Sequence, residues 1–178
     1  MSKYYFAVAS LPHLEYDMEN IFPIEQFLEI CERNLKPEHL NLIKSAHLDN
    51  PEQPLTSNKL LNDWLIWERN LRNNLVLLRA EDKNELPEKY LRENQETPLN
   101  YRFISEAYES ESPLNAEEIL YLERWSFLDN IESGHYFDEI NLIVYYIKLQ
   151  ILWRKHSLNK ESGTRKFGQL LELQNITI

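Results

Sequence analysis

The sequence predicts a mostly α-helical protein built as a multi-helix bundle. Two observations lead to this fold class: long segments place apolar residues at helical spacing, and the 178-residue chain contains only 3 glycines. All-β folds need many turn glycines, so this scarcity disfavours them. Hydrophobic residues make up 43% of the chain and aromatic residues 12%, which is enough apolar surface to form a core without disulfides or metals.

The first segment, Tyr4–Ala9, is a continuous apolar run that ends before Pro12. Its length fits either a short buried strand or an extended segment packed on helices, and the pattern does not decide between them. Two short helices are predicted next, over Pro23–Leu35 and from Pro37 to about Ala46. Each has proline in its first turn and apolar residues at helical spacing.

The longest helix of the first half is predicted to begin after a cap at Thr56 or Ser57 and to end near Ala80. One side carries a wide apolar stripe that includes Trp64 and Trp67. The other side interleaves arginines with asparagines, although asparagine is a poor helix former; these polar residues are Arg69, Asn70, Arg72, Asn73, Asn74 and Arg79. A polar seam between helices, a docking ridge for a partner and an ordinary solvated face all fit this pattern.

Residues 87–112 contain Pro87, Pro98 and many polar groups, and they are predicted to form a linker or an irregular crossing. This segment separates an N-terminal helical lobe, residues 1–86, from a C-terminal helical lobe, residues 113–178. We expect the two lobes to pack as one compact unit.

Three helices are predicted in the C-terminal lobe. The first has Asn115 as its cap and ends near Ile131, because Ser133-Gly134 breaks the pattern. The second covers Phe137–His156, and the third surrounds Phe167–Leu173. The first two are bulky and apolar on nearly every face, so we expect them to be buried within a bundle or against a partner.

Five residues are candidate partner-binding residues. Arginine and tyrosine are enriched at the energetic centres of protein interfaces. Tyr145 and Tyr146 are adjacent and therefore point to different faces of one helix, and three arginines lie on the long helix of the first half. The candidates are Arg69, Arg72, Arg79, Tyr145 and Tyr146.

The formal net charge of −10 argues against nucleic-acid binding and against charge-driven binding to an anionic membrane. Solubility explains this acidity, and so does a basic protein partner. The densest apolar run, residues 139–153, is shorter than the roughly 20 residues of a membrane span. We therefore expect a cytoplasmic protein without direct membrane insertion.

No motif for catalysis, cofactor or metal stands out. The glycines are not clustered as a phosphate-binding loop requires, and Cys31 fits a small buried hydrophobe better than a nucleophile. We expect a non-enzyme without cofactors. If the chain were nonetheless an enzyme, Glu132, His135 and Glu139 would be the first place to look.

Three blocks of the sequence resemble a protein family of unknown function that is encoded in bacterial V-type (A/V-type) ATPase operons. The first block is Lys3–Pro12. The second is Trp67–Ala80, which is also similar to helices of the funnel-like V-type ATPase adaptor that sits on the membrane rotor ring and receives the central stalk. The third block joins Glu123-Arg124-Trp125 and Phe137 to Leu149–Trp153, Leu158–Gly163 and Phe167.

The resemblance implies a non-catalytic accessory subunit of a V-type ATPase, equivalent to that funnel-like adaptor. In that role the chain would link the central stalk to the membrane rotor ring and support proton or sodium transport. Its partners would be other subunits of the complex, and it would lie peripherally at the cytoplasmic membrane. A free-standing helical interaction or assembly factor is the alternative, with self-association into a homo-oligomer left open.

Overall fold

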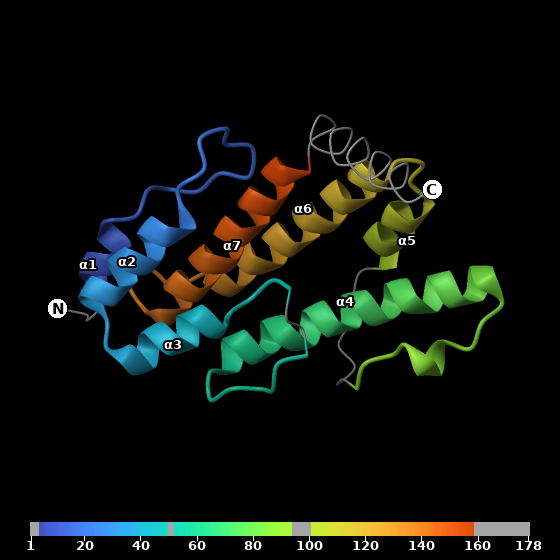
Figure 1. Cartoon of the computed structure of the whole chain (residues 1–178), viewed down its shortest axis with the longest axis horizontal. Helices are drawn as coiled ribbons and strands as arrows, with labels where there is room; N and C mark the ends of the chain where they lie inside the picture. The colour runs from blue at the N-terminus through green and yellow to red at the C-terminus, as the bar shows by residue number, and fades with distance from the viewer. Residues whose placement is uncertain (1–3, 50–51, 94–100, 159–178) are drawn as a thin grey trace, which may run out of the picture.

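The computed structural model describes residues 4–49, 52–93 and 101–158, and the statements below concern these ranges. They contain seven α-helices, one short 3-10 helix and no strands, so the predicted mostly α-helical fold is confirmed (Figure 1). The elements are α1 (Tyr5–Ala9), α2 (Ile24–Asn34), α3 (Pro37–Ser45), α4 (Lys59–Lys83), η1 (Pro87–Lys89), α5 (Tyr101–Glu109), α6 (Pro113–Glu132) and α7 (Glu139–Ser157).

Helix α7 is the centre of the bundle and packs against α2, α3, α4 and α6. Every residue from Leu142 to Leu149 is buried, which confirms the all-round burial predicted for this helix. The same prediction is wrong for α6. That helix buries one face, which includes Leu120 and Leu128, while Leu122 is 49% exposed.

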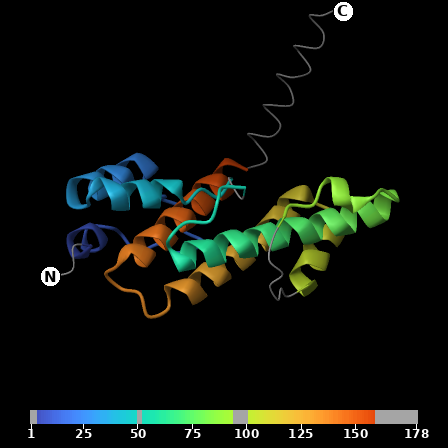
Figure 2. The same cartoon turned by 90° about the horizontal axis from the view of Figure 1, so that it is seen from below.

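The molecule is elongated, with α4, α6 and α7 running lengthwise (Figures 1 and 2). Helices α1, α2 and α3 lie at one end, and α5 lies with the last turns of α4 at the other. The 25 residues of α4 span about 37 Å at 1.5 Å per residue. The core contains residues of both predicted lobes, from Tyr4 to Leu152.

The extended or strand conformation expected for Tyr4–Ala9 is wrong, because Tyr5–Ala9 is helix α1. A lone strand would leave its backbone groups without partners, whereas a helical turn satisfies them internally. Val8 N donates to Tyr4 O at 3.0 Å, and Ala7 is fully buried. The helix ends where the Ser10 hydroxyl donates to Phe6 O at 2.7 Å.

Both predicted helix caps are displaced. Asn58, and not Thr56 or Ser57, caps α4 by accepting from Leu61 N at 3.0 Å. Ser112, and not Asn115, caps α6. In each case the true cap lies directly before the first helical residue, where its oxygen reaches the free amide hydrogens of the first turn.

Part of the predicted linker is helical. Tyr101–Glu109 forms α5, which buries Phe103, Ile104 and Ala107. The linker prediction for residues 87–112 is therefore wrong in this part, because the amphipathic spacing of these three residues gave α5 a face to bury against α6 and α4. The helix predicted around residues 167–173 lies outside the described residues.

Candidate functional site

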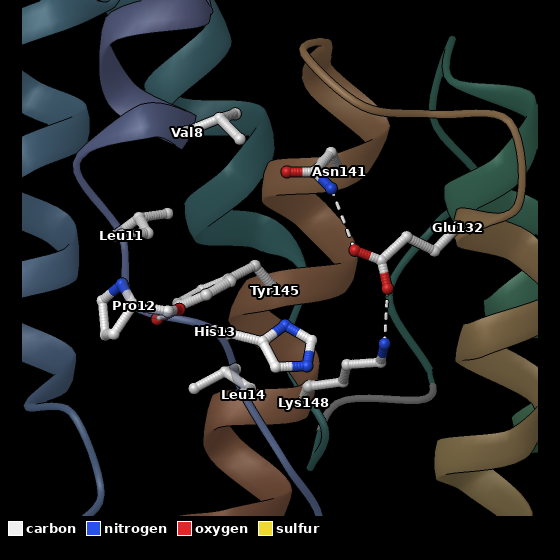
Figure 3. A pocket seen from close by; sticks show the side chains of 9 residues that line it. All are labelled: Val8, Leu11, Pro12, His13, Leu14, Glu132, Asn141, Tyr145 and Lys148. Carbon is white, nitrogen blue, oxygen red and sulfur yellow. Dashed lines mark hydrogen bonds and ion pairs between the residues drawn. The ribbon is translucent and has the colours of Figure 1, made fainter.

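A groove of about 240 Å³ lies between the N-terminal segment and the start of α7 (Figure 3). One wall belongs to α1 and the residues after it, and the other belongs to α7 and the end of α6. The lining residues are Val8, Leu11, Pro12, His13, Leu14, Glu132, Asn141, Tyr145 and Lys148.

Local structure explains how these residues meet. Asn141, Tyr145 and Lys148 are spaced by four and three positions, so they share one face of α7. Gly134 has φ +87°, a left-handed conformation that glycine adopts without steric cost. It reverses the chain after α6, so that Glu132 faces α7. The Tyr145 hydroxyl donates to Pro12 O at 3.0 Å and holds the two walls together.

One side of the groove carries a charged cluster, which we call the groove-edge cluster: Lys148, Glu132 and Asp129. Lys148 Nζ lies 2.6 Å from Asp129 Oδ1 and is hydrogen-bonded to Glu132 Oε2. The Lys148 side chain is 8% exposed, whereas Glu132 and Asp129 are 30% and 55% exposed. One ammonium faces two carboxylates, so the cluster has a formal charge of −1.

The groove-edge cluster is held in place from two sides. Asn141 Nδ2 donates to Glu132 Oε1 at 2.9 Å and to His135 O at 3.3 Å. Lys148 Nζ also lies 5.2 Å from the centroid of the Trp125 ring, which is a favourable cation–π distance. The ammonium is therefore surrounded by acceptors of its own chain.

An exposed aromatic rim adjoins the groove, consisting of Tyr5, Phe6 and Phe137. Their exposed fractions are 40%, 59% and 44%, and the Tyr5 and Phe137 ring centroids are 4.9 Å apart. Tyr5 lies one helical turn before Val8, and Phe137 lies four residues before Asn141, so the rim continues the line of the two walls. Clustered exposed aromatic side chains are typical of binding surfaces.

A second charged cluster lies inside the bundle, between α4 and α6. Glu68 accepts two hydrogen bonds from Arg124, each at 2.9 Å, and a third from Arg72 Nε at 2.7 Å. We call these three residues the buried cluster. Burial alone would lower the pKa of the Arg124 guanidinium, but the charge and hydrogen bonds of Glu68 outweigh it and raise that pKa above its ordinary value.

The arginines predicted to bind a partner are placed differently from one another. Arg72 Nη2 donates to Leu48 O at 3.1 Å, and Arg69 donates to Gln53 O. Both side chains therefore hold the segment that connects α3 to α4. Arg79 is exposed near the end of α4. For Arg69 and Arg72 the structure favours the polar seam among the three interpretations of this helix.

Tyr145 and Tyr146 lie in the core, with exposed fractions of 8% and 5%. The Phe27 ring stacks on both, at centroid distances of 5.4 and 5.3 Å. Burial raises the pKa of both tyrosines. A partner docking on the folded chain would not reach these rings, except for the part of Tyr145 that lines the groove.

Glu132, His135 and Glu139 do not converge on one site. Glu132 belongs to the groove-edge cluster, and His135 Nδ1 lies 2.6 Å from Asp138 Oδ2. Glu139 Oε1 lies 2.7 Å from His39 Nδ1. In the described ranges no three His, Cys, Asp or Glu side chains are grouped to hold a metal ion.

Cys31 is fully buried, as predicted, and burial raises the pKa of its thiol to about 12. Sequence reasoning missed the groove, whose walls come from segments more than 100 positions apart. The one available signal was Lys148, a charged residue inside the most apolar helix of the chain. Such a residue requires a partner when it is buried.

Across the described part of the chain, every helix falls short of the length and apolarity that a membrane crossing requires. Comparisons of the sequence with protein-family models and with curated proteins, and of the fold with solved structures, found no match.

Proposed function

We propose that this chain is a non-catalytic accessory subunit of a V-type ATPase. It would act as a helical adaptor between the central stalk and the membrane rotor ring, lying peripherally at the cytoplasmic membrane. The observation that carries the adaptor role is the placement of exposed apolar side chains at both ends of an elongated bundle. A body of this kind is suited to holding two partners apart at a fixed distance.

The aromatic rim occupies one end of the bundle. A second group of exposed apolar residues, which we call the distal patch, occupies the other end around the last turns of α4 and η1. Its members are Leu77, Leu86, Tyr90 and Leu91, with exposed fractions of 42%, 80%, 49% and 36%. Exposed apolar groups gathered in this way mark protein contact sites more often than free surface.

The resemblance of the three sequence blocks supports the choice of the V-type ATPase. The first block, residues 3–12, includes α1 and part of the groove wall. The second block, residues 67–80, lies within α4 and contains the buried cluster's Glu68 and Arg72. Parts of the third block lie in α6 and α7.

The test is co-purification from cells that express the V-type ATPase encoded with this chain. A tagged full-length chain is expected to recover stalk and ring subunits. Phe6→Ser in the aromatic rim is expected to lower that recovery about tenfold, because truncating an aromatic anchor costs roughly 1–2 kcal/mol. Leu122→Ser is the matched control, since Leu122 is similarly exposed but lies on α6 away from the rim.

Two outcomes would contradict the proposal. One is a tagged chain that never recovers ATPase subunits. The other is an equal loss of recovery with Phe6→Ser and Leu122→Ser, which would mean that the rim has no special part. The aromatic rim also favours a second candidate function, a self-associating interaction protein. Light scattering that finds a stable homodimer, lost with Phe6→Ser, would support this candidate.

A further inference from the structure

We propose that the groove receives a lysine or arginine side chain from a protein partner. The inference rests on the proposed function in one respect only, which is that a partner protein exists. The groove itself and its charges are properties of this chain, so they can be tested without the partner.

The size of the groove suits one side chain. Its volume of about 240 Å³ is below the roughly 300–1,000 Å³ of small-molecule and cofactor sites. It is open to solvent along its length and adjoins the aromatic rim, so a bound segment can lie on the rim while one residue enters the groove. A protein anchor therefore fits better than a free cofactor.

The two walls match the two parts of a basic side chain. Val8, Leu11 and Leu14 form an apolar wall, and the methylene stems of lysine and arginine pack on such surfaces. The opposite wall ends in Glu132, whose carboxylate uses one oxygen for Asn141 and the other for Lys148. A carboxylate has about four acceptor positions, so Glu132 retains capacity for an incoming donor.

The charge of the groove selects a cation over an anion. Lys148 is the one charged base of the lining, and two carboxylates already surround its ammonium. An anionic group approaching Lys148 would meet those carboxylates at close range. The last carbonyls of α6 add partial negative charge beside Glu132. His13, which is exposed at the groove, is the other basic group, and imidazoles are uncharged at pH 8.

The test uses capped amino acids as probes in an NMR titration of the full chain at pH 8. Nα-acetyl-lysine amide and Nα-acetyl-arginine amide are expected to shift the backbone signals of Val8, His13 and Asn141, with millimolar dissociation constants. Nα-acetyl-norleucine amide has the same stem without the charge and is expected to bind at least threefold more weakly. Nα-acetyl-glutamate amide is expected to leave these signals unmoved.

Two variants give effects of opposite sign. Glu132→Gln is expected to weaken binding of the cationic probes about three- to fivefold, as loss of a partly exposed ion pair predicts. Lys148→Met removes the competing cation and is expected to strengthen binding by a similar factor. Glu29→Gln on α2 is the matched control and is expected to change nothing, because Glu29 pairs only with Arg33 at the surface in the described contacts. If Glu132→Gln does not fold, Asp129→Asn provides the same comparison.

The proposal is overturned if the glutamate probe shifts the groove signals, if Lys148→Met abolishes binding of the cations, or if no cationic probe binds at about 50 mM. These failures are distinct from failure of the proposed function. A chain that recovers ATPase subunits but ignores the probes refutes the groove alone. A chain that binds the probes but recovers no ATPase subunits refutes the ATPase assignment alone.

Discussion

The buried cluster and the groove-edge cluster both join α6 to a neighbouring helix through a basic and an acidic side chain, but their surroundings differ. In the buried cluster the Glu68 side chain is 1% exposed and Arg124 is 7% exposed. In the groove-edge cluster Lys148 is about as buried as Arg124, whereas its partners Glu132 and Asp129 are substantially exposed. The same chemistry is thus enclosed in one place and open on one side in the other.

This difference separates a structural role from a binding role. Glu68 accepts three hydrogen bonds from two arginines and is closed to any further ligand. Glu132 accepts from Lys148 and Asn141 but keeps contact with the groove. An enclosed ion pair fixes how α4 meets α6, while an open one leaves a carboxylate able to bind something else.

The largest expected effect comes from breaking the buried cluster. Glu68→Ala leaves the Arg124 guanidinium enclosed without a counter-charge, which costs about 3–5 kcal/mol. Urea unfolding monitored by circular dichroism measures the change. Glu29→Ala, which breaks an exposed pair with Arg33, is the control and is expected to cost less than about 0.5 kcal/mol.

Replacing both partners of the buried pair is expected to be far milder. The double variant Glu68→Met with Arg124→Leu removes both charges and fills the space with apolar atoms, so most of the lost stability should return. A double-mutant cycle with the same unfolding assay measures this recovery. A double variant as unstable as Glu68→Ala would mean that packing, and not charge, sets the requirement at this site.

Lys148→Met is expected to cost only about 1 kcal/mol, although Lys148 is as buried as Arg124. Glu132 and Asp129 are left partly hydrated when the ammonium is removed, so no buried charge remains unpaired. The same unfolding assay measures the effect. A loss as large as that of Glu68→Ala would remove the distinction between the two clusters.

The smallest effect concerns Glu123, beside the buried cluster on α6. Burial raises the pKa of its carboxyl. The folded state therefore holds its proton more tightly, and the resulting stability is present below the ordinary pKa and lost as pH rises through the folded value. Glu123→Gln is thus expected to raise the melting temperature slightly at pH 7, with the difference vanishing near pH 3. A variant that destabilises the protein at pH 7 would contradict this.

The two clusters also mark how far the sequence can be read. The burial of α7 followed from apolar residues on every face, and the break before it followed from Gly134. Helix α1 was missed, because five apolar residues have no period from which to choose a helix over a strand. The pairing of Glu68 with Arg124 spans 56 positions, and only the tertiary packing of α4 on α6 brings them together.

The groove was hidden for the same reason. Lys148 was visible as an interruption of an apolar run, but its neighbours depend on the turn at Gly134 and on the path of the chain from Val8 to Leu14. The candidate arginines of α4 were correctly identified as unusual. Their use within the chain, for Arg69 and Arg72, depended on a connecting segment whose course local spacing does not define.

The carboxylate of Glu139 has a consequence for how this protein is made. It accepts from the Tyr4 hydroxyl at 3.1 Å and from Asn58 Nδ2 at 3.1 Å, and it lies 2.7 Å from His39 Nδ1. These bonds join the starts of α1, α3, α4 and α7 across sequence separations of 135, 81 and 100 residues. Contacts between such distant positions form late, since the long intervening loops must close first. A nascent chain therefore completes this end of the molecule only after residue 139 has left the ribosome.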